Sequence, residues 1–135
     1  MNTVHYKSLF GRLTGVNENE LWHKARLVYG ATVKSKRRLP YVRSKYFKNE
    51  KVFLDLFWSH TNSKKPRVRR ERLAFYQCGL DLIHNTTHKP KEIYVKGNLC
   101  YKFLGLSRDN EEFCVQIKRE KNGGKWLLSI FPTKI

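Results

Sequence analysis

The side chains that could move protons or hold anions in this chain are histidines, arginines and lysines, outside any familiar catalytic motif. There is no glycine-rich phosphate loop, no His-x-x-x-His pattern on an expected helix and no serine-nucleophile elbow. His84 and His88 have a metal-ligand spacing that works only on a helix, but a loop without an obvious third ligand is expected there, so no metal and no cofactor are predicted. The remaining inventory suits metal-independent cleavage of RNA, in which a base activates the 2′-hydroxyl, an acid protonates the leaving 5′-oxygen, and Arg or Lys stabilises the phosphate charge.

The composition indicates an anionic partner. The 135 residues include 28 Lys and Arg against 11 Asp and Glu, which gives a formal net charge of +17. Nucleic acid is the commonest partner for such a charge, and ribosome association, an anionic membrane surface or an acidic protein are the alternatives. Because hydrophobic residues make up 40% of the chain, a single folded domain over residues 1–135 is expected.

The cysteines and the apolar runs indicate the cellular compartment in which the protein acts. Cys78, Cys100 and Cys114 are odd in number and far apart, which argues against a disulfide scaffold and favours a reducing cytoplasm. No apolar run approaches the roughly 18 residues of a transmembrane helix, and the first residues lack the apolar region of a secretory signal. The prediction is therefore a cytoplasmic site of action without a membrane partner, with export as a toxin as the exception.

The periodicity predicts helices first and strands afterwards. Helices are expected over Asn17–Gly30, with Asn17 as the N-cap, over Asn49–Asn62 and over Val68–His84. Strands are expected over 93–95, 99–106, 113–118 and 126–131. The predicted fold class is α+β, with N-terminal helices packed on a C-terminal three- to four-stranded antiparallel sheet. Residues 1–47 would be a basic region with one helix, and residues 48–135 the core.

Alternating residues predict the register of the last hairpin. A two-residue turn within Asn122–Gly124 places two sets of apolar residues on one face, where we expect Phe113, Val115, Ile117, Trp126, Leu128 and Ile130. Gln116, Lys118 and Ser129 then lie on the opposite, half-open face. If the preceding turn also has two residues, Tyr101 joins them there.

Basic residues cluster in two stretches that are candidate phosphate contacts. Residues 34–51 hold eight Lys and Arg with interleaved aromatic residues, and a second stretch follows near residue 65. A solvated basic loop is the alternative interpretation. The nucleic-acid-binding candidates are Lys36, Arg37, Arg38, Arg43, Lys45, Lys64, Lys65, Arg67, Tyr101 and Gln116.

Several segments together resemble the barnase/colicin/RelE-like (BECR) nucleases, above all phage- and mobile-element-associated members. The resemblance rests on FWSH at 57–60, RRERL at 69–73, CGLDLI at 78–83, FCVQIK at 113–118 and LSIFP at 128–132. It implies helices on a four-stranded antiparallel sheet and metal-independent RNA cleavage, often by a toxin. The positions here that fit such a site are His60 as the general base, Arg69, Arg72 and Lys118 on the phosphate, and Ser129 orienting it.

Three functions follow as expectations. The first is a metal-independent endoribonuclease, a toxin or effector that leaves a cyclic phosphate, with tRNA, rRNA or mRNA as the target and an antitoxin or immunity protein as a further partner. The second is a non-catalytic nucleic-acid-binding module of a phage, plasmid or mobile element. The third is an accessory protein whose nuclease fold now binds a protein partner.

Overall fold

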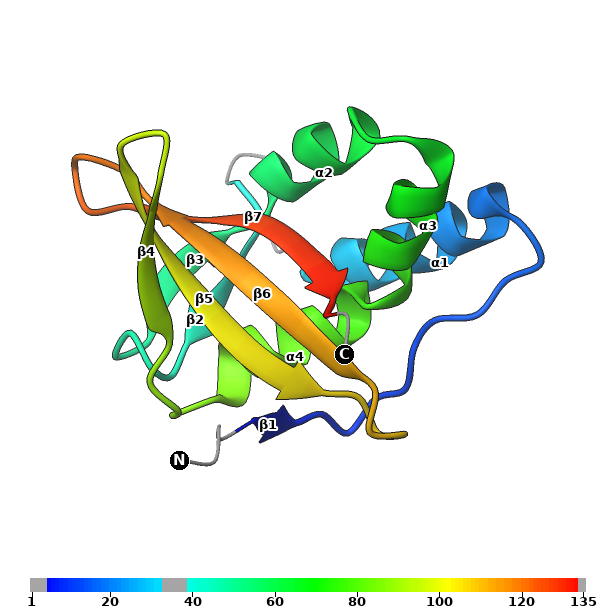
Figure 1. The fold of residues 1–135 in the computed structure, drawn as a ribbon, viewed down its shortest axis with the longest axis horizontal. Coiled ribbons are helices and arrows are strands. Elements are labelled where there is room, and N and C mark those ends of the chain that lie inside the picture. The colour runs from blue at the N-terminus through cyan, green and yellow to red at the C-terminus, as the bar shows by residue number, and fades with distance from the viewer. Residues whose placement is uncertain (1–4, 33–38, 134–135) are drawn as a thin grey trace.

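A curled, mixed β-sheet that wraps around one helix organises the computed structural model, which describes residues 5–32 and 39–133 (Figure 1). In chain order, the described elements are β1 (Tyr6–Lys7), α1 (Glu18–Thr32), β2 (Tyr41–Ser44), β3 (Glu50–Phe53), α2 (Asp55–Asn62), α3 (Pro66–Ala74), α4 (Tyr76–Asn85), β4 (Lys91–Val95), β5 (Asn98–Leu106), β6 (Glu112–Arg119) and β7 (Lys125–Pro132). None of these described helices has the length and apolar character needed to cross a membrane.

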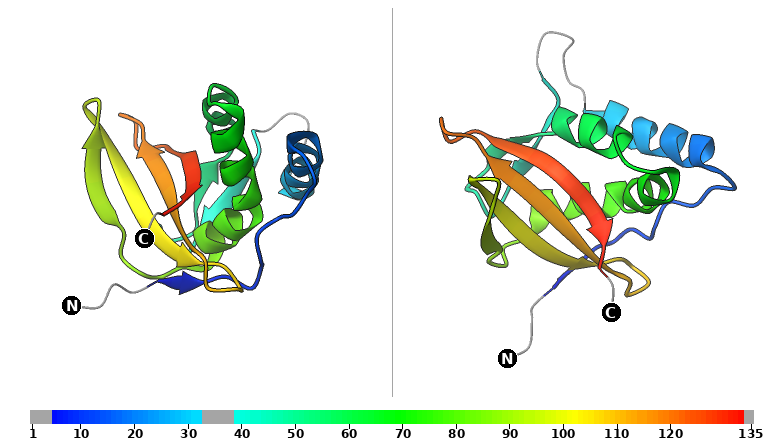
Figure 2. Two further views of the ribbon diagram at one scale, coloured as in Figure 1. Left: turned by 45° about the vertical axis from the view of Figure 1, so that its right-hand side comes forward. Right: turned by 45° about the horizontal axis from the view of Figure 1, so that its top comes forward.

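The predicted three- to four-stranded antiparallel sheet is wrong. The described sheet has seven strands in the order β1-β5-β6-β7-β3-β2, with β4 paired to β5 beside β1. Two of its pairings are parallel, β1 with β5 and β3 with β7. The difference comes from three short strands in the N-terminal half, β1, β2 and β3, which extend both edges of the C-terminal meander and curl it into a half-barrel (Figure 2).

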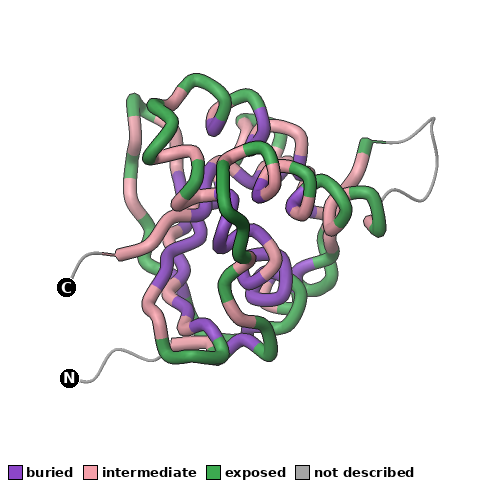
Figure 3. The backbone as a smooth tube through the Cα atoms, turned by 90° about the vertical axis from the view of Figure 1, so that its right-hand side faces the viewer, coloured by how far each residue is buried: buried purple, intermediate pink, exposed green. Residues whose placement is uncertain are grey.

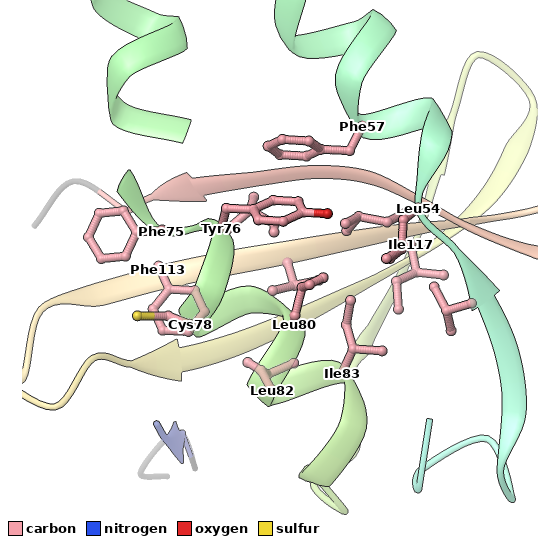
Figure 4. Close-up of a cluster of buried hydrophobic side chains, with 14 of the residues drawn as sticks. Leu54, Phe57, Phe75, Tyr76, Cys78, Leu80, Leu82, Ile83, Phe113 and Ile117 are labelled. Atoms are coloured by element: carbon pink, nitrogen blue, oxygen red, sulfur yellow. The ribbon is translucent and has the colours of Figure 1, made fainter. Parts of the chain in front are cut away.

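Helix α4 lies inside this curl and is buried on nearly all sides (Figure 3). Its apolar side chains pack between the sheet and the start of α2, with Tyr76 beside Phe57 and Leu54 (Figure 4). Two glycines allow the close approach of helix and sheet. A Cβ on Gly79 would lie 2.3 Å from Ile130 Cδ1, and one on Gly105 would lie 2.7 Å from Leu82 Cδ1. The core therefore depends on these two positions remaining small.

The predicted helices are correct in part. Asn17 caps α1 by accepting a hydrogen bond from the Glu20 amide at 3.0 Å, as expected, but the helix continues past Gly30 to Thr32. The helix predicted over 49–62 is wrong at its start, because residues 50–53 form β3 and pair with β2 and β7. The helix predicted over 68–84 divides at Phe75 into α3 and α4. Tertiary pairing and packing override the local pattern at both places.

The predicted pairing of the last two strands is correct, but its register holds only in part. The loop keeps three residues between the paired Glu120 and Gly124, which shifts the register by one residue. A β-bulge near Gln116 and Ile117 then shifts it back. As a result Leu127 is fully buried opposite Ile117, while Trp126 and Leu128, for which burial is predicted, are only half-buried.

The segment before α1 is tied to α4 through one buried carboxylate. Asp81 accepts hydrogen bonds from the Tyr6 hydroxyl at 3.0 Å, the Ser8 hydroxyl at 2.8 Å and the Leu9 amide at 3.1 Å. Asn85 donates a fourth, at 2.8 Å. The Asp81 carboxylate thus holds β1 against the edge of β5, a role that the sequence alone does not indicate.

Candidate functional site

His60 lies in the last turn of α2, which follows β3 directly and packs against β7. One turn earlier, Phe57 and Trp58 are buried against Tyr76, each with its ring centroid 4.9 Å from the Tyr76 ring. These contacts anchor the helix. Within the described residues no hydrogen bond occupies the His60 imidazole, which is half-buried. Its two ring nitrogens are therefore available to a ligand.

The surroundings of His60 keep its ring neutral. Burial lowers the pKa of His60 below its usual 6.5, and the nearby positive charges of Lys64, Arg72 and Lys96 lower this pKa further. A neutral imidazole at pH 7 can accept a proton, which is the form that a general base requires. The geometry and the charges therefore both suit His60 for proton abstraction.

Arg72, in the last turn of α3, has hydrogen-bond donors without acceptors. Its guanidinium carbon lies 5.5 Å from the centroid of the Phe131 ring on β7. The Nε and Nη1 atoms are buried and lack a partner among the described residues. Buried donors are nearly always hydrogen-bonded, and a guanidinium matches the geometry of a phosphate. Because these two nitrogens are buried, a phosphate would meet the guanidinium through Nη2, which is not among the buried unpartnered atoms.

We call His60, Lys64, Arg72 and Lys96 the His60 cluster. Lys96 belongs to the Lys96–Gly97 turn between β4 and β5, where both residues have positive φ, 51° and 81°. No salt bridge within the described residues involves any member of the cluster. Glu71 offsets the charge of Arg72 in part. The cluster still holds like charges without an ion pair, and these repel each other, so an anion placed among them would be stabilised.

The other two predicted catalytic residues lie on the sheet face that points away from α4, which we call the open face. Two rows of cross-strand neighbours run over it: Lys91, Lys102, Gln116 and Ser129, and then Ile93, Cys100, Lys118 and Trp126. The predicted face of Gln116, Lys118 and Ser129 is thus confirmed. Ser129 is buried and donates a hydrogen bond to Gln116 Oε1 at 3.2 Å, and the Lys118 ammonium lies 3.7 Å from Glu120.

Within the described residues, Arg69 contacts the His60 cluster only through the backbone carbonyl of Lys64, and its guanidinium is taken up by other partners. Its guanidinium donates to both carboxylate oxygens of Glu18 on α1 and to the carbonyl oxygen of Lys64. This bidentate pair raises the pKa of Arg69 and lowers that of Glu18. The side chain therefore joins α1 to α3, and its donors are already used.

The predicted nucleic-acid contacts are dispersed. Arg43, Lys45, Lys65 and Arg67 are exposed, whereas Lys36, Arg37 and Arg38 lie outside the described residues.

The expectation that Tyr101 lies on the open face is wrong. It is buried on the core face opposite Ile117, with its ring centroid 4.9 Å from that of Phe47. The β5–β6 connection runs through residues 107–111 rather than a two-residue turn, and this length sets the face on which Tyr101 lies.

Sequence reasoning missed Lys96 and Phe131 as parts of the site. The pair Lys96–Gly97 between two strand-like runs is a two-residue hairpin signal that could have placed Lys96 at a turn. No sequence signal shows that this turn comes near α2. Phe131 is a strand aromatic residue whose position beside Arg72 depends on how α3 packs.

Comparisons with known proteins identify no relative of this chain. No family model matches the chain, no curated protein matches it, and no solved structure matches its fold. Among the residues that the structure describes, no group of three or more His, Cys, Asp or Glu side chains is arranged to hold a metal ion. The function is therefore argued from the residues themselves.

Proposed function

We propose that the protein is an endoribonuclease that cleaves RNA through attack of the 2′-hydroxyl on the adjacent phosphate. The observation that carries this proposal is half-buried His60, whose pKa is lowered by burial and by nearby positive charges that include Arg72, a guanidinium with two buried nitrogens that lack a partner among the described residues. This reaction needs a general base close to a guanidinium that can donate hydrogen bonds to the phosphate. The formal net charge of +17 would draw RNA to the protein at low salt.

Each step has a group in the His60 cluster to perform it. His60 takes the proton of the 2′-hydroxyl, and the 2′-oxygen forms a bond to phosphorus. Arg72 donates hydrogen bonds to the phosphate oxygens as their negative charge grows. The bond from phosphorus to the 5′-oxygen then breaks, and the leaving oxygen takes a proton from the ammonium group of Lys64 or Lys96. The products are a 2′,3′-cyclic phosphate and a 5′-hydroxyl. His60 then gives its proton to solvent, and the lysine takes one back from solvent.

Two predicted residues take supporting roles and a third drops out. Lys118, on β6, is half-buried on the open face and can contact the RNA chain beside the scissile phosphate. Ser129, on β7, is buried and donates to Gln116, so it acts by orienting the Gln116 side chain on that face. Arg69 is left out because Glu18 and the Lys64 carbonyl hold its donors. An antitoxin or immunity partner would be expected to cover the His60 cluster, since that is the site to be silenced.

The test is cleavage of an end-labelled oligoribonucleotide in excess EDTA by wild type, His60→Gln and Arg72→Met. We expect a cyclic phosphate on the upstream product. Loss of general base catalysis should reduce the rate of His60→Gln by about 10²–10⁴-fold. The control is His23→Gln, because His23 is an exposed histidine on α1, and it should keep the wild-type rate.

The outcomes separate the alternatives. Full activity of His60→Gln, or cleavage only after metal is added, would reject the proposed mechanism. Salt-sensitive RNA binding without any cleavage would instead support the non-catalytic nucleic-acid-binding module, which needs only the basic surface.

A further inference from the structure

A lysine-lined cavity opens at the edge of the sheet, away from the His60 cluster. Its volume is about 550 Å³, and it is lined by Thr86, His88, Lys89, Lys91, Lys102, Phe103 and Leu104. β4 pairs with β5 over residues 98–102 and β1 pairs with it at residues 105–106, so Phe103 and Leu104 lie between the two partner strands on this edge. The cavity occupies the gap that the two strands leave.

The lining is positive and lacks a counter-charge. No carboxylate lines the cavity, and within the described residues none of its three lysines forms an ion pair. Lys102 does help to lower the pKa of Glu112, but that carboxylate already accepts a hydrogen bond from Thr133 and is hydrogen-bonded to His5. The volume lies within the range of ligand sites and exceeds what a lone phosphate group needs. A phosphate with its attached nucleoside suits both charge and size.

The open face connects this cavity with the His60 cluster. Lys91, Lys102, Gln116 and Ser129 form one cross-strand row that runs over β4, β5, β6 and β7. Neighbouring strands lie about 4.8 Å apart, so the row from β4 to β7 spans about 14 Å. Ser129 stands two residues from Phe131, the ring under Arg72. A single polynucleotide strand laid over the row would contact Lys91, Lys102 and Gln116 and would pass over buried Ser129 toward Arg72.

We propose that the lysine-lined cavity is a second phosphate-binding subsite and that the substrate is a single RNA strand long enough to span the open face. The direction of the RNA strand and its cleavage rest on the proposed function, whereas binding of RNA at the cavity does not. A dinucleotide held at Arg72 would not reach the cavity. A longer strand would place a distal phosphate among Lys89, Lys91 and Lys102.

The experiment measures binding of RNA that cannot be cleaved. The probes are a 2′-O-methyl hexanucleotide and a 2′-O-methyl dinucleotide, each labelled with a fluorophore and followed by anisotropy over a series of salt concentrations. The test variant is Lys91→Gln with Lys102→Gln. The control is Lys24→Gln with Arg108→Gln, which removes the same charge from α1 and the β5–β6 connection, outside both basic stretches.

We expect the test variant to bind the hexanucleotide on the order of tenfold more weakly than the control variant does. Its plot of log Kobs against log salt should be shallower by about 0.7, the slope that each neutralised phosphate of a single strand contributes. Dinucleotide binding should be the same in both variants. Equal hexanucleotide affinity in the two variants would overturn the proposal, as would an equal weakening with the dinucleotide.

The proposed catalysis and the proposed subsite can be refuted separately. If wild type binds the hexanucleotide through the cavity lysines but cuts no RNA, the subsite stands and the proposed catalysis falls. If RNA is cut through His60 while the cavity lysines leave hexanucleotide binding unchanged, the subsite falls and the proposed catalysis stands.

Discussion

Gly79→Ala should destabilise the protein, although alanine is the better helix former. Gly79 lies in α4 where this helix crosses β7, and an added Cβ would lie 2.3 Å from Ile130 Cδ1 and 2.8 Å from Ile130 Cγ1. Ile130 is fully buried, so its side chain has no free space to move into. Gly30 in α1 is the matched control, because a Cβ there would meet nothing within 4 Å.

The expected size follows from two opposing effects. Exchanging a helical glycine for alanine stabilises a helix by about 1 kcal/mol. Overpacking a core destabilises by about 1–3 kcal/mol. Ordinary van der Waals contact begins near 3.4 Å, so the overlap at Ile130 is severe and the upper end of that range applies. Gly79→Ala should therefore lose about 2 kcal/mol of unfolding free energy, or about 6–10 °C in Tm, whereas Gly30→Ala should gain about 1 kcal/mol.

Urea unfolding followed by circular dichroism measures both variants. Ile130→Val removes the nearest clashing atom, so it should cost less stability in the Gly79→Ala background than in wild type, where it removes only a buried methyl group. If Gly79→Ala were as stable as wild type, α4 could not pack against β7 as closely as described. The same conclusion would follow if Ile130→Val cost equally much in both backgrounds.

Two further predictions concern charged groups. The pKa of His60 is lower in the folded state, so as pH falls the unfolded chain takes up this proton before the folded protein does. The free energy of unfolding should therefore decrease as pH falls from 6.5 toward the lower folded-state pKa. Urea midpoints at about pH 8 and about pH 5 should differ less in His60→Gln than in wild type, and an equal difference would contradict the pKa shift. Asp81→Ala should lose about 2–4 kcal/mol of unfolding free energy, because it leaves buried donors without an acceptor. Hydrogen exchange should become faster at the Ser8 amide, which donates to the Leu106 carbonyl. The control Asp109→Ala, at an exposed residue, should change little, and slow exchange in Asp81→Ala would refute the anchoring role.

The C-terminal half could be predicted well because its signals are local. Alternating residues set the four later strands, and the faces of Gln116, Lys118 and Ser129 followed from their spacing alone. The burial of Leu127 in place of Leu128 could not be predicted, because a three-residue loop and a compensating bulge leave no separate mark on the pattern.

The N-terminal half was less predictable because its strands depend on distant partners. Val52 and Phe53 stand at helical spacing from Leu56 and Phe57, yet residues 50–53 form β3 because β2 and β7 supply hydrogen bonds on both sides. The resemblance to a nuclease family implied a smaller sheet for the same reason, since the segments that carried it lie between residues 57 and 132. At the candidate site, residue type pointed to His60 and Arg72, whereas the capture of Arg69 by Glu18 depends on how α1 packs against α3.

The two parallel pairings also set an order of events during synthesis. Tyr6 pairs opposite Gly105 and Val52 opposite Lys125, so β1 and β3 leave the ribosome long before their partner strands exist. At about 5–20 residues per second, the roughly 100 residues between β1 and β5 take about 5–20 seconds to add. The ring that lies under Arg72 belongs to β7, the last strand of all. A nascent chain therefore carries His60 and Arg72 for many residues before the Phe131 ring is made, and the complete arrangement forms only after β7 has been synthesised.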